Sequence, residues 1–341
     1  MKKFVHIGFP KSGSTWLQAN LFQVHPEIHF LGRGTGGSVI DDEVRLLLCS
    51  DLIYKPRVLY DAKACRAVIE RHVAEAGNRP TVRLVGVSHE SLTTSFLRGQ
   101  DLVERATRLR DCFGPDTRIV MIIRSQLSQI ESMYKSAVVE LGLQLGFREF
   151  VEHLYLDYDR SPLSDLLYWE MYCVYRERFA EGGVSLFLFE RFKRGPLAFA
   201  NDLCAHLGLS PIDSADEKPA NPSPSAERIG VLLRRNRQKP FYLGQGISGR
   251  EWGHTSLPWY TQVLGVPVPE RIDRAWERYK ENRKVLRGRA RHRVLAWLRE
   301  RRADLTMPDE IRRRIAEFYA SSNMRLAAET GLPLAEHGYP M

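Results

Sequence analysis

The sequence predicts an α/β fold in which a parallel β-sheet is flanked by helices. Apolar runs of strand length recur at 3–9, 83–87, 118–123 and 184–189, and a weaker run lies at 27–31. Stretches with helical periodicity separate these runs, and strands that alternate with helices usually form a parallel sheet with crossover helices. The run at 119–123 is apolar at every position, which is typical of a strand that is covered on both faces.

At 341 residues the chain is long enough to bury a sizeable core. We expect a single domain over 1–341, made of a nucleotide-binding α/β core at 1–210, a loop-rich lid region at 211–270 and C-terminal helices at 271–341. Pro, Ser and Asp are frequent at 211–225, which favours a loop there. The last helix is expected to begin at 306–310, where a hydroxyl, an early proline and two acidic residues form a start signal. The C-terminal helices should form a layer appended to the core.

The composition favours a soluble globular protein, with 43% hydrophobic and 27% charged residues. The five cysteines include no Cys-x-x-Cys pair, so neither a zinc site nor a disulfide framework is indicated and a cytoplasmic location is expected. No apolar stretch approaches the ~20 residues that a transmembrane helix needs. The net charge of +9 favours anionic partners, which include nucleic acids, acidic glycans, membrane surfaces and nucleotides.

The first apolar run leads into a phosphate-binding type of loop at 10–16, which reads Pro-Lys-Ser-Gly-Ser-Thr-Trp. In an ordinary P-loop, a lysine directly before the Ser or Thr reaches the outer phosphates of a nucleotide. Here the glycine spacing and the hydroxyl of Thr15 are kept, but Ser14 occupies the lysine position and Lys11 lies inside the loop. Backbone N–H groups at a helix start still favour an anion. We therefore predict phosphate binding, with Lys11 placed to reach the group attached to a 5′-phosphate.

A second candidate anion site follows the apolar run at 118–123. Arg124 ends this run, and the segment after it is expected to be a helix with Ser125 as its N-cap. Serines at 125, 128, 132 and 136 fall roughly on one face of that helix. An arginine at the end of a strand and a serine one to two turns into the next helix can bind the same phosphate, because the planar guanidinium matches phosphate oxygens.

Two titratable residues, His89 and Glu90, follow the apolar run at 83–87. Ligands of open parallel sheets bind at the carboxyl ends of the strands. Since an imidazole titrates near neutral pH and is the usual general base for a hydroxyl, we expect His89 to be the base. Glu90 is then its orienting partner or an alternative base, and a purely structural role for the histidine stays open.

These features resemble the sulfotransferases that use 3′-phosphoadenosine 5′-phosphosulfate (PAPS). The loop of that family reads Pro-Lys-Ser-Gly-Ser/Thr-Thr-Trp, nearly the sequence found at 10–16. The family holds the 3′-phosphate of the donor with an Arg and a Ser eight residues later, the separation of Arg124 and Ser132. The segments 185–209 and 312–340 resemble bacterial carbohydrate sulfotransferases. The segment 246–252 is similar to a late loop that covers the nucleotide, although the Arg and Lys expected just before it are absent.

The resemblance implies metal-independent transfer of a sulfuryl group from PAPS to an acceptor hydroxyl, with release of 3′,5′-ADP. It favours a carbohydrate or glycolipid acceptor, with a lipid, a peptide tyrosine or a small phenol left open, and it implies that His89 or Glu90 takes the acceptor proton. Lys11 would stabilise charge on the bridging oxygen as the nucleotide leaves. The residues implied in nucleotide binding are Lys11, Ser12, Gly13, Ser14, Thr15, Trp16, Arg124 and Ser132. No metal ligand is implied, and the oligomeric state cannot be deduced from the sequence.

Two alternative functions stay open. The first is a kinase or NTPase with a deviant P-loop, which requires Mg²⁺ and ATP and gives the spacing of Arg124 and Ser132 no purpose. The second is a basic anion-binding protein without catalysis, in which the Arg- and Lys-rich segment 271–302 contacts nucleic acid or a membrane. Acidic residues are interspersed in that segment and it contains no known nucleic-acid-binding motif, so we expect no nucleic acid partner.

Overall fold

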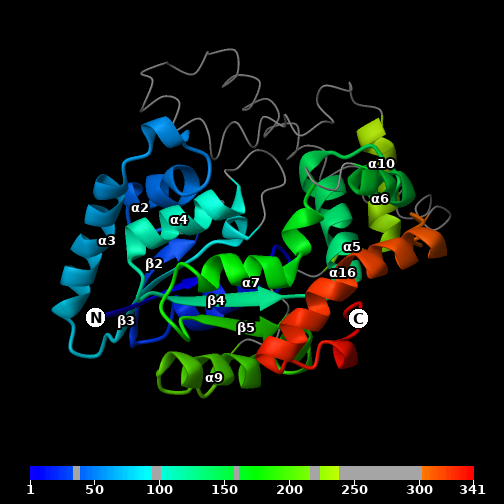
Figure 1. Ribbon diagram of the computed structural model, residues 1–341. Helices are drawn as coiled ribbons and strands as arrows, with labels where there is room; N and C mark the ends of the chain where they lie inside the picture. Colours follow the sequence, from blue (N-terminus) through cyan, green and yellow to red (C-terminus); the bar gives the residue numbers. More distant parts are fainter. Residues whose placement is uncertain (34–38, 94–100, 157–160, 216–222, 238–301) are drawn as a thin grey trace, which may run out of the picture. The chain divides into compact units, whose positions relative to one another are not determined.

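We describe the protein from a computed structural model, which covers residues 1–33, 39–93, 101–156, 161–215, 223–237 and 302–341 (Figure 1). The chain forms two compact units. The first comprises Met1–Gln129, Leu154–Pro222 and Arg312–Met341, and the second comprises Ile130–His153 and Ser223–Ile311. The prediction of a single domain with boundaries at 210 and 270 stays a prediction.

The first unit contains a five-stranded sheet in the order β2-β3-β1-β4-β5. All four strand pairs are parallel. The strands are β1 (Lys2–His6), β2 (Ile28–Arg33), β3 (Leu84–Ser88), β4 (Arg118–Ile123) and β5 (Val184–Leu188). Each of the five apolar runs in the sequence overlaps one of these strands. The predicted α/β fold with a parallel sheet is therefore confirmed.

The central strand β1 lies at the point where the strand order reverses. The chain leaves β1 toward β2 and β3 and then crosses to β4 and β5 on the other side. In such sheets a crevice forms at the carboxyl ends of the two strands whose following segments diverge, which here are β1 and β4. The pairing of these strands extends beyond β1, because the Phe9 N–H donates to the Ile122 carbonyl at 3.3 Å. The loop after β1 thus begins at this crevice.

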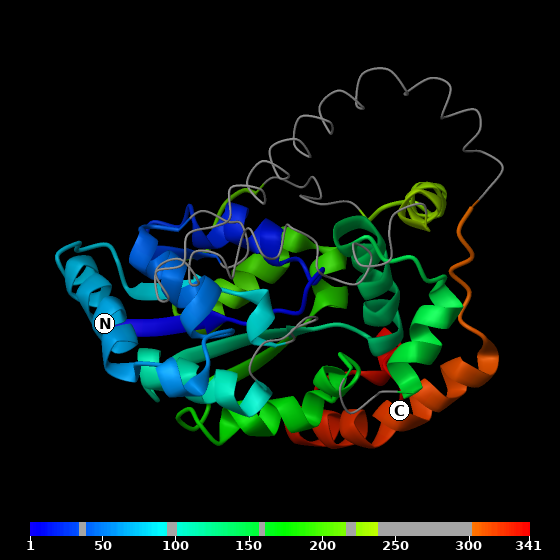
Figure 2. The ribbon, with the colours of Figure 1, turned by 90° about the horizontal axis from the view of Figure 1, so that it is seen from above.

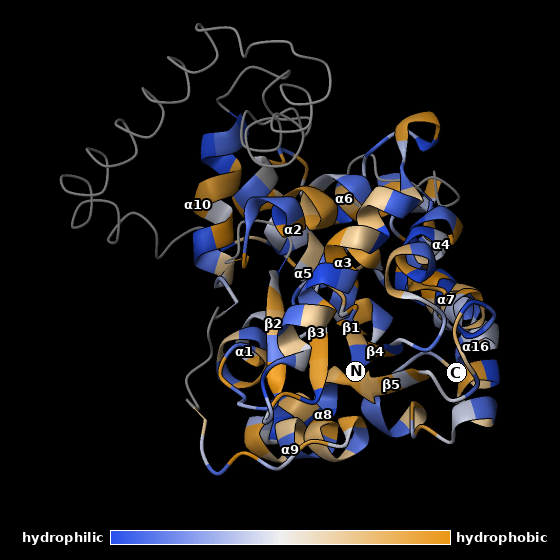
Figure 3. Ribbon diagram, turned by 90° about the vertical axis from the view of Figure 1, so that its left-hand side faces the viewer, coloured by the Kyte–Doolittle hydropathy of each residue, from blue (hydrophilic) through white to orange (hydrophobic). Residues whose placement is uncertain are grey.

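Helices cover both faces of the sheet. On one face lie α1 (Ser14–Leu17) with the π-helical segment Gln18–Phe22 that continues it, α8 (Phe189–Arg194) and α9 (Pro196–Leu207). Figure 3 shows α8 and α9 below the strands. The apolar side chains of this layer form one buried cluster with alternate residues of β4, Val120 and Ile122. The opposite face carries α3 (Ala62–Gly77), α4 (Leu102–Phe113) and α7 (Tyr168–Arg176). Coverage on both faces explains why the strand sequences are continuously apolar.

The C-terminal helix α16 (Asp309–Thr330) begins where the sequence predicted. Within the first unit it packs beside α7 (Figures 1 and 2), where the Ser322 hydroxyl donates to Glu170 at 2.6 Å. The buried side chain of Asn323 donates to the Pro340 carbonyl at 2.7 Å and so fixes the C-terminal tail. The predicted C-terminal helical layer is present in this helix, whereas residues 271–301 lie outside the described part of the chain.

The second unit contains α10 (Ala226–Arg237), a helix inside the region that we predicted to be loop-rich. Ile229 and Leu233 are four residues apart and both are buried, which gives the segment the apolar face of an amphipathic helix. The Ser225 hydroxyl accepts a hydrogen bond from the Arg228 N–H at 3.3 Å at the helix start. The helix was not predicted because the Pro- and Ser-rich sequence before it indicated a loop. Residues 238–270, with the late loop at 246–252, lie outside the described residues.

The remaining elements are α2 (Asp42–Leu46) with the π-helical segment Leu47–Asp51, α5 (Gln126–Ser136) with the π-helical segment Ala137–Leu141, α6 (Phe147–Leu156), and the 3₁₀ turns Arg57–Leu59, Glu90–Leu92, Ser164–Leu166 and Ala335–His337. Among the described helices, none combines the length and the apolar character that a membrane span requires.

Candidate active site

The loop after β1 starts with a tight turn over residues 9–12. The Ser12 N–H donates to the Phe9 carbonyl at 3.1 Å, and the buried Ser12 hydroxyl donates to the same carbonyl. Pro10 occupies the second position and Lys11, with a φ of +66°, the third. Proline followed by a positive φ is the pattern of a type II turn. Lys11 is thus held at the apex of the turn with its side chain exposed, in a conformation that non-glycine residues rarely adopt.

Neighbouring elements hold the loop by its carbonyl groups. Thr93 Oγ1 donates to the Gly8 carbonyl at 3.3 Å, Gln129 Nε2 to the Pro10 carbonyl at 3.0 Å, and a terminal guanidinium nitrogen of Arg124 to the Lys11 carbonyl at 3.1 Å. The C=O and N–H of one peptide unit point in opposite directions. Because the Pro10 and Lys11 carbonyls are bonded to the surrounding protein, the N–H groups of Lys11 and Ser12 point away from those partners.

Gly13 connects this turn to α1. Its φ is +86°, and a Cβ at this position would lie 2.8 Å from the ring of Phe192, so a glycine is required for both conformation and space. The same ring packs edge-on against Trp16, at 5.4 Å between ring centres. Trp16 is buried in the core below the loop. The structure therefore shows Trp16 as a support of the loop, and its contact with a nucleotide stays a prediction.

Ser14 begins α1 with a hydroxyl that is buried and has no hydrogen-bond partner among the described residues. A Cβ on Gly8 would come within 2.9 Å of this hydroxyl, so the glycine leaves the Ser14 Oγ close to the loop backbone. The N–H groups of a helix's first turn have no acceptor within the helix. A phosphate oxygen at this position would accept hydrogen bonds from the Ser14 hydroxyl and from such N–H groups. The residues present thus fit a phosphate.

Arg124 lies directly after β4, and its side chain is held in place on several sides. Its Nε donates to the Ser128 hydroxyl at 2.8 Å, and its guanidinium carbon lies 4.8 Å from the centre of the Phe189 ring. Its main-chain carbonyl accepts a hydrogen bond from Tyr168 at 2.5 Å. Together with the bond to the Lys11 carbonyl, these contacts place Arg124 beside the loop. The serine that Arg124 contacts is Ser128, one helical turn before Ser132.

Ser132 lies further along α5, in the part of the helix that belongs to the second unit. Its role in binding a 3′-phosphate stays a prediction. Ser125, the expected N-cap, directly precedes α5, and its hydroxyl donates to the Gly338 carbonyl at 2.8 Å. The C-terminal tail therefore reaches the start of this helix.

His89 and Glu90 follow β3, as predicted, but their environments differ. The His89 ring is 1% exposed, and its Nδ1 accepts a hydrogen bond from the Ser91 N–H at 3.1 Å. Burial lowers the pKa of His89 to about 4. With one nitrogen bonded, the other buried and a lowered pKa, His89 is a weak base. Glu90 is half-buried, and which of the two residues takes the acceptor proton stays a prediction.

A buried polar network below the loop was not predicted from the sequence. Nδ1 of His6, in β1, lies 2.7 Å from the Ser88 hydroxyl, which also accepts a hydrogen bond from Gln18 at 2.7 Å. Arg33 in turn donates to Gln18 at 3.3 Å. Burial lowers the pKa of His6 to about 3, so the ring is neutral at pH 7. The signal in the sequence was the single histidine in the otherwise uncharged run at 4–9.

Glu190 also lies at the carboxyl end of the sheet, where the sequence places it after the fifth strand without giving it a role. It follows β5, and one carboxylate oxygen accepts a hydrogen bond from the Ser125 N–H at 3.0 Å. The other accepts from the Tyr339 hydroxyl at 3.1 Å. This carboxylate thus joins the ends of β4 and β5 to the C-terminal tail. Both hydrogen bonds indicate a structural role for Glu190. None of the five described strands is followed directly by an aspartate that could serve a P-loop kinase.

No protein-family model and no curated protein matches this chain. Among solved structures, a sulfotransferase from Alicyclobacillus acidocaldarius is 22% identical, with a TM-score of 0.45, over 72% of this chain and 98% of that one. Mouse sulfotransferase SULT7A1, complexed with PAP, is 15% identical with a TM-score of 0.33, over 69% and 64%. The sulfotransferase domain from the curacin biosynthetic pathway is 15% identical with a TM-score of 0.34, over 81% and 98%. At such low similarity we base the function on this chain's own residues.

Proposed function

We propose that the protein is a PAPS-dependent sulfotransferase that transfers a sulfuryl group to an acceptor hydroxyl and releases 3′,5′-ADP. The observation that supports this proposal most strongly is the hydrogen bond from Arg124 to the Lys11 carbonyl. It brings together two distant motifs that the family resemblance assigns to opposite ends of the same nucleotide. A chance similarity in the loop alone would not require an arginine at the end of β4.

The loop would hold the 5′-phosphate of the donor. Ser12, Gly13, Ser14 and Thr15 are the residues proposed for this contact. The buried hydroxyl of Ser14 supplies a donor without a partner among the described residues, and the exposed side chain of Lys11 supplies positive charge. An anion at this point would thus gain both hydrogen bonds and Coulomb attraction.

Arg124 and Ser132 would hold the 3′-phosphate. In the structure the Arg124 Nε is bonded to Ser128, and its ring contact with Phe189 limits where the guanidinium can move. A side chain already fixed in this way loses little conformational freedom when it binds a phosphate. We propose that Ser128 orients the arginine and that Ser132 contacts the phosphate.

In the proposed reaction the acceptor oxygen attacks sulfur in line with the bond to the bridging oxygen. The new S–O bond forms as the bond to the bridging oxygen breaks, and the electron pair leaves with 3′,5′-ADP. Glu90 accepts the proton of the acceptor hydroxyl, a step worth ~10²- to 10⁴-fold in rate. Lys11 stabilises the charge that develops on the bridging oxygen. The reaction needs no metal, because a sulfuryl group carries less negative charge than a phosphoryl group.

We propose a carbohydrate or glycolipid hydroxyl as the acceptor and the cytoplasm as the location. The resemblance of 185–209 and 312–340 to bacterial carbohydrate sulfotransferases supports the acceptor class. The net charge of +9 is compatible with an acceptor that already carries anionic groups.

The test is a thermal-shift titration with 3′,5′-ADP, compared with 5′-AMP and with ATP plus Mg²⁺. A ligand of the folded state stabilises it by RT ln(1 + [L]/Kd), about 2.7 kcal/mol at a hundredfold excess over Kd. We expect 3′,5′-ADP to raise the melting temperature without a metal, and 5′-AMP to have a much smaller effect. A shift that requires Mg²⁺ and ATP would instead support the kinase alternative, and no shift with any nucleotide would support the non-catalytic alternative.

A further inference from the structure

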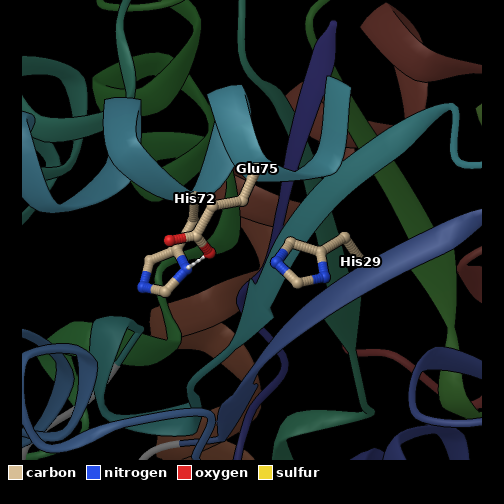
Figure 4. Close-up of side chains that lie close together, drawn as sticks. All are labelled: His29, His72 and Glu75. Carbon is tan, nitrogen blue, oxygen red and sulfur yellow. Dashed lines mark hydrogen bonds and ion pairs between the residues drawn. The ribbon is translucent and has the colours of Figure 1, made fainter. Parts of the chain in front are cut away.

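We propose that His29, His72 and Glu75 form a zinc-binding site that joins β2 to α3. This site is separate from the proposed sulfuryl-transfer site. His29 is the second residue of β2 and lies near the amino end of the strand, whereas the loop at 10–16 follows the carboxyl end of β1. His72 and Glu75 are three residues apart on α3, so they share one face of the helix, and Figure 4 shows that face directed at His29.

The three side chains offer ligand atoms that all lie within 4.8 Å of one another. Nδ1 of His72 is 3.1 Å from a carboxylate oxygen of Glu75. Zinc binds imidazole nitrogen and carboxylate oxygen at about 2.0–2.2 Å, so the ligands must close in slightly around the ion. Glu75 is exposed, and its carboxylate can turn to make this adjustment.

An independent observation is the state of the His29 ring. His29 is 4% exposed, and its Nε2 is buried without a hydrogen-bond partner among the described residues. In Figure 4 the nitrogen nearest to the other two side chains points at the pair formed by His72 and Glu75. A buried nitrogen left unpaired costs about 1–3 kcal/mol. A metal ion between the three side chains would remove that cost.

The second nitrogen of His72 faces another carboxylate. Its Nε2 lies 3.0 Å from Asp41 Oδ2, and Asp41 caps α2 by accepting from the Val44 N–H at 2.8 Å. A terminal nitrogen of Arg71 also lies 3.3 Å from Nε2 of His72, so this nitrogen has a cationic and an anionic neighbour. In zinc sites the histidine nitrogen that does not bind the metal usually donates to a carboxylate, as Nε2 of His72 would do here.

Two arginines lie near the cluster and limit its net negative charge. Arg71 forms ion pairs with Asp41, with Glu43 and, at 3.9 Å, with the proposed ligand Glu75. Arg71 is exposed and can turn away from Glu75 when a cation binds. A terminal nitrogen of Arg79 is 3.3 Å from Nδ1 of His29. When Nε2 of His29 binds a metal, Nδ1 must carry the proton, and Arg79 has to leave this contact. Arg79 is exposed, so its side chain can move into solvent.

Two imidazoles and one carboxylate, with a fourth position for water, are the ligand set of zinc rather than of calcium or magnesium. The ligands come from the edge strand β2 and from the last turns of α3, and Asp41 extends the connection to α2. Zinc bound here would therefore act as a clamp between these elements and would take no part in sulfuryl transfer.

The experiment uses the full chain, treated with a chelator and then titrated with Zn²⁺ by calorimetry. We expect one equivalent of zinc to bind and to raise the melting temperature. Glu75→Gln should weaken zinc binding about tenfold or more, whereas Glu70→Gln, an exposed carboxylate on the same helix, should bind zinc like the wild type. His29→Asn removes the buried ligand and should also weaken binding, and Co²⁺ in place of zinc should give the intense visible absorption of a four-coordinate site.

Three results would overturn the proposal. These are no zinc uptake by the wild type, equal affinity of the wild type and Glu75→Gln, or a Co²⁺ spectrum typical of six-coordinate surface binding. Each would mean that no zinc ion is held between the three side chains. Binding of 3′,5′-ADP, measured on the same proteins, should be unchanged in the variants, so the outcome does not depend on the proposed sulfotransferase activity.

Discussion

Arg124, at the end of β4, donates a hydrogen bond of 3.1 Å to the main-chain carbonyl of Lys11, in the loop after β1. The two residues are far apart in sequence, but β1 and β4 are neighbours in the sheet. The guanidinium therefore fixes the backbone of the residue whose side chain we propose to act on the transferred group. Loss of Arg124 should disturb both nucleotide binding and the position of Lys11.

The first prediction concerns the strained conformation of Lys11. A non-glycine residue with a φ of +66° destabilises the folded state by about 1–2 kcal/mol. Glycine removes this strain, but the greater entropy of the unfolded chain destabilises folding by about 0.5–1 kcal/mol. Lys11→Gly should therefore raise the free energy of unfolding by about 0.5–1 kcal/mol, measured by urea denaturation. Because it also removes the cation, the rate of sulfuryl transfer from PAPS should fall ~10²- to 10³-fold.

Lys11→Ala is the control for this prediction, since it removes the cation but keeps a side chain that is strained at this φ. It should lose activity to the same extent without the gain in stability. A Lys11→Gly protein with a near-wild-type rate would contradict the proposed role of the lysine.

The second prediction concerns the 3′-phosphate. Arg124→Lys keeps the charge but loses the planar fork and the contacts with Ser128 and Phe189. Its affinity for 3′,5′-ADP should fall about tenfold or more, the scale of a lost charge-assisted hydrogen bond of about 1.5–3 kcal/mol. Its affinity for 5′-AMP should fall less than its affinity for 3′,5′-ADP, because 5′-AMP depends on Arg124 only through the Lys11 carbonyl. Calorimetry with both nucleotides measures the difference.

Alanine variants of two serines of α5, Ser128 and Ser132, test the same 3′-phosphate site. Ser132→Ala should reduce the affinity for 3′,5′-ADP because a phosphate contact is lost. Ser128→Ala should have a smaller effect, because Ser128 only orients Arg124. The reverse order of affinities would show that Ser128 is the phosphate ligand and that the family spacing does not apply to this chain.

The third prediction separates the two candidate bases. Glu90→Gln should lower kcat by ~10²- to 10⁴-fold, the usual effect of losing a general base, while the Kd for 3′,5′-ADP stays unchanged. His89→Asn keeps an acceptor for the Ser91 N–H and should lower kcat much less. If His89→Asn abolishes turnover and Glu90→Gln does not, the histidine must reach the acceptor in a conformation different from the one described.

Much of the fold could be predicted because its signals are local in sequence. Continuous apolar runs identify the strands, and the start signal at 306–310 identifies α16. The loop at 10–16 and Arg124 could be found for the same reason, since a strand end is visible in the sequence and strand ends meet at one edge of a parallel sheet.

The features that could not be predicted depend on contacts between distant residues. The burial of His89 is one such feature, because it follows from the packing around β3 rather than from the sequence near it. The choice of Ser128 over Ser132 as the partner of Arg124 depends on side-chain conformation. The cluster of His29 with His72 and Glu75 joins a strand to a helix more than forty residues later, and no short motif contains all three.

The fourth prediction concerns pH and stability. His89 has a pKa of about 4 in the folded protein, against 6.5 in the unfolded chain. The stability that the neutral His89 ring contributes is therefore fully present above pH 6.5. It is lost as the pH falls toward 4, because in this range only the unfolded state takes up the proton. The free energy of unfolding should fall by up to about 1.4 kcal/mol per pH unit on account of this residue.

Urea denaturation at several values between pH 7 and pH 5, where most carboxylates remain ionised, measures this slope. His89→Asn should give a shallower fall in stability than the wild type. His153→Asn replaces a histidine that is exposed on α6 and serves as the control, with the slope of the wild type. Equal slopes for both variants would mean that His89 is protonated in the folded protein.

The fifth prediction compares two glycines that both have a positive φ. Gly208 ends α9 with a φ of +74°, and a Cβ added there would have no atom within 4 Å, whereas at Gly13 the Cβ would meet the Phe192 ring at 2.8 Å. Gly208→Ala should cost about 1–2 kcal/mol from backbone strain alone. Gly13→Ala should cost about 1–3 kcal/mol more, because the ring must move in a packed core.

The displaced Phe192 ring would also press on Trp16, its edge-on neighbour below the loop. Gly13→Ala should therefore weaken binding of 3′,5′-ADP, whereas Gly208→Ala should not. Phe192→Leu combined with Gly13→Ala makes room for the new methyl group, and the double variant should be more stable than the sum of the single effects predicts. Additive effects would mean that Phe192 yields without cost, in which case the position of the loop is set by Arg124, Gln129 and Thr93 through its carbonyl groups.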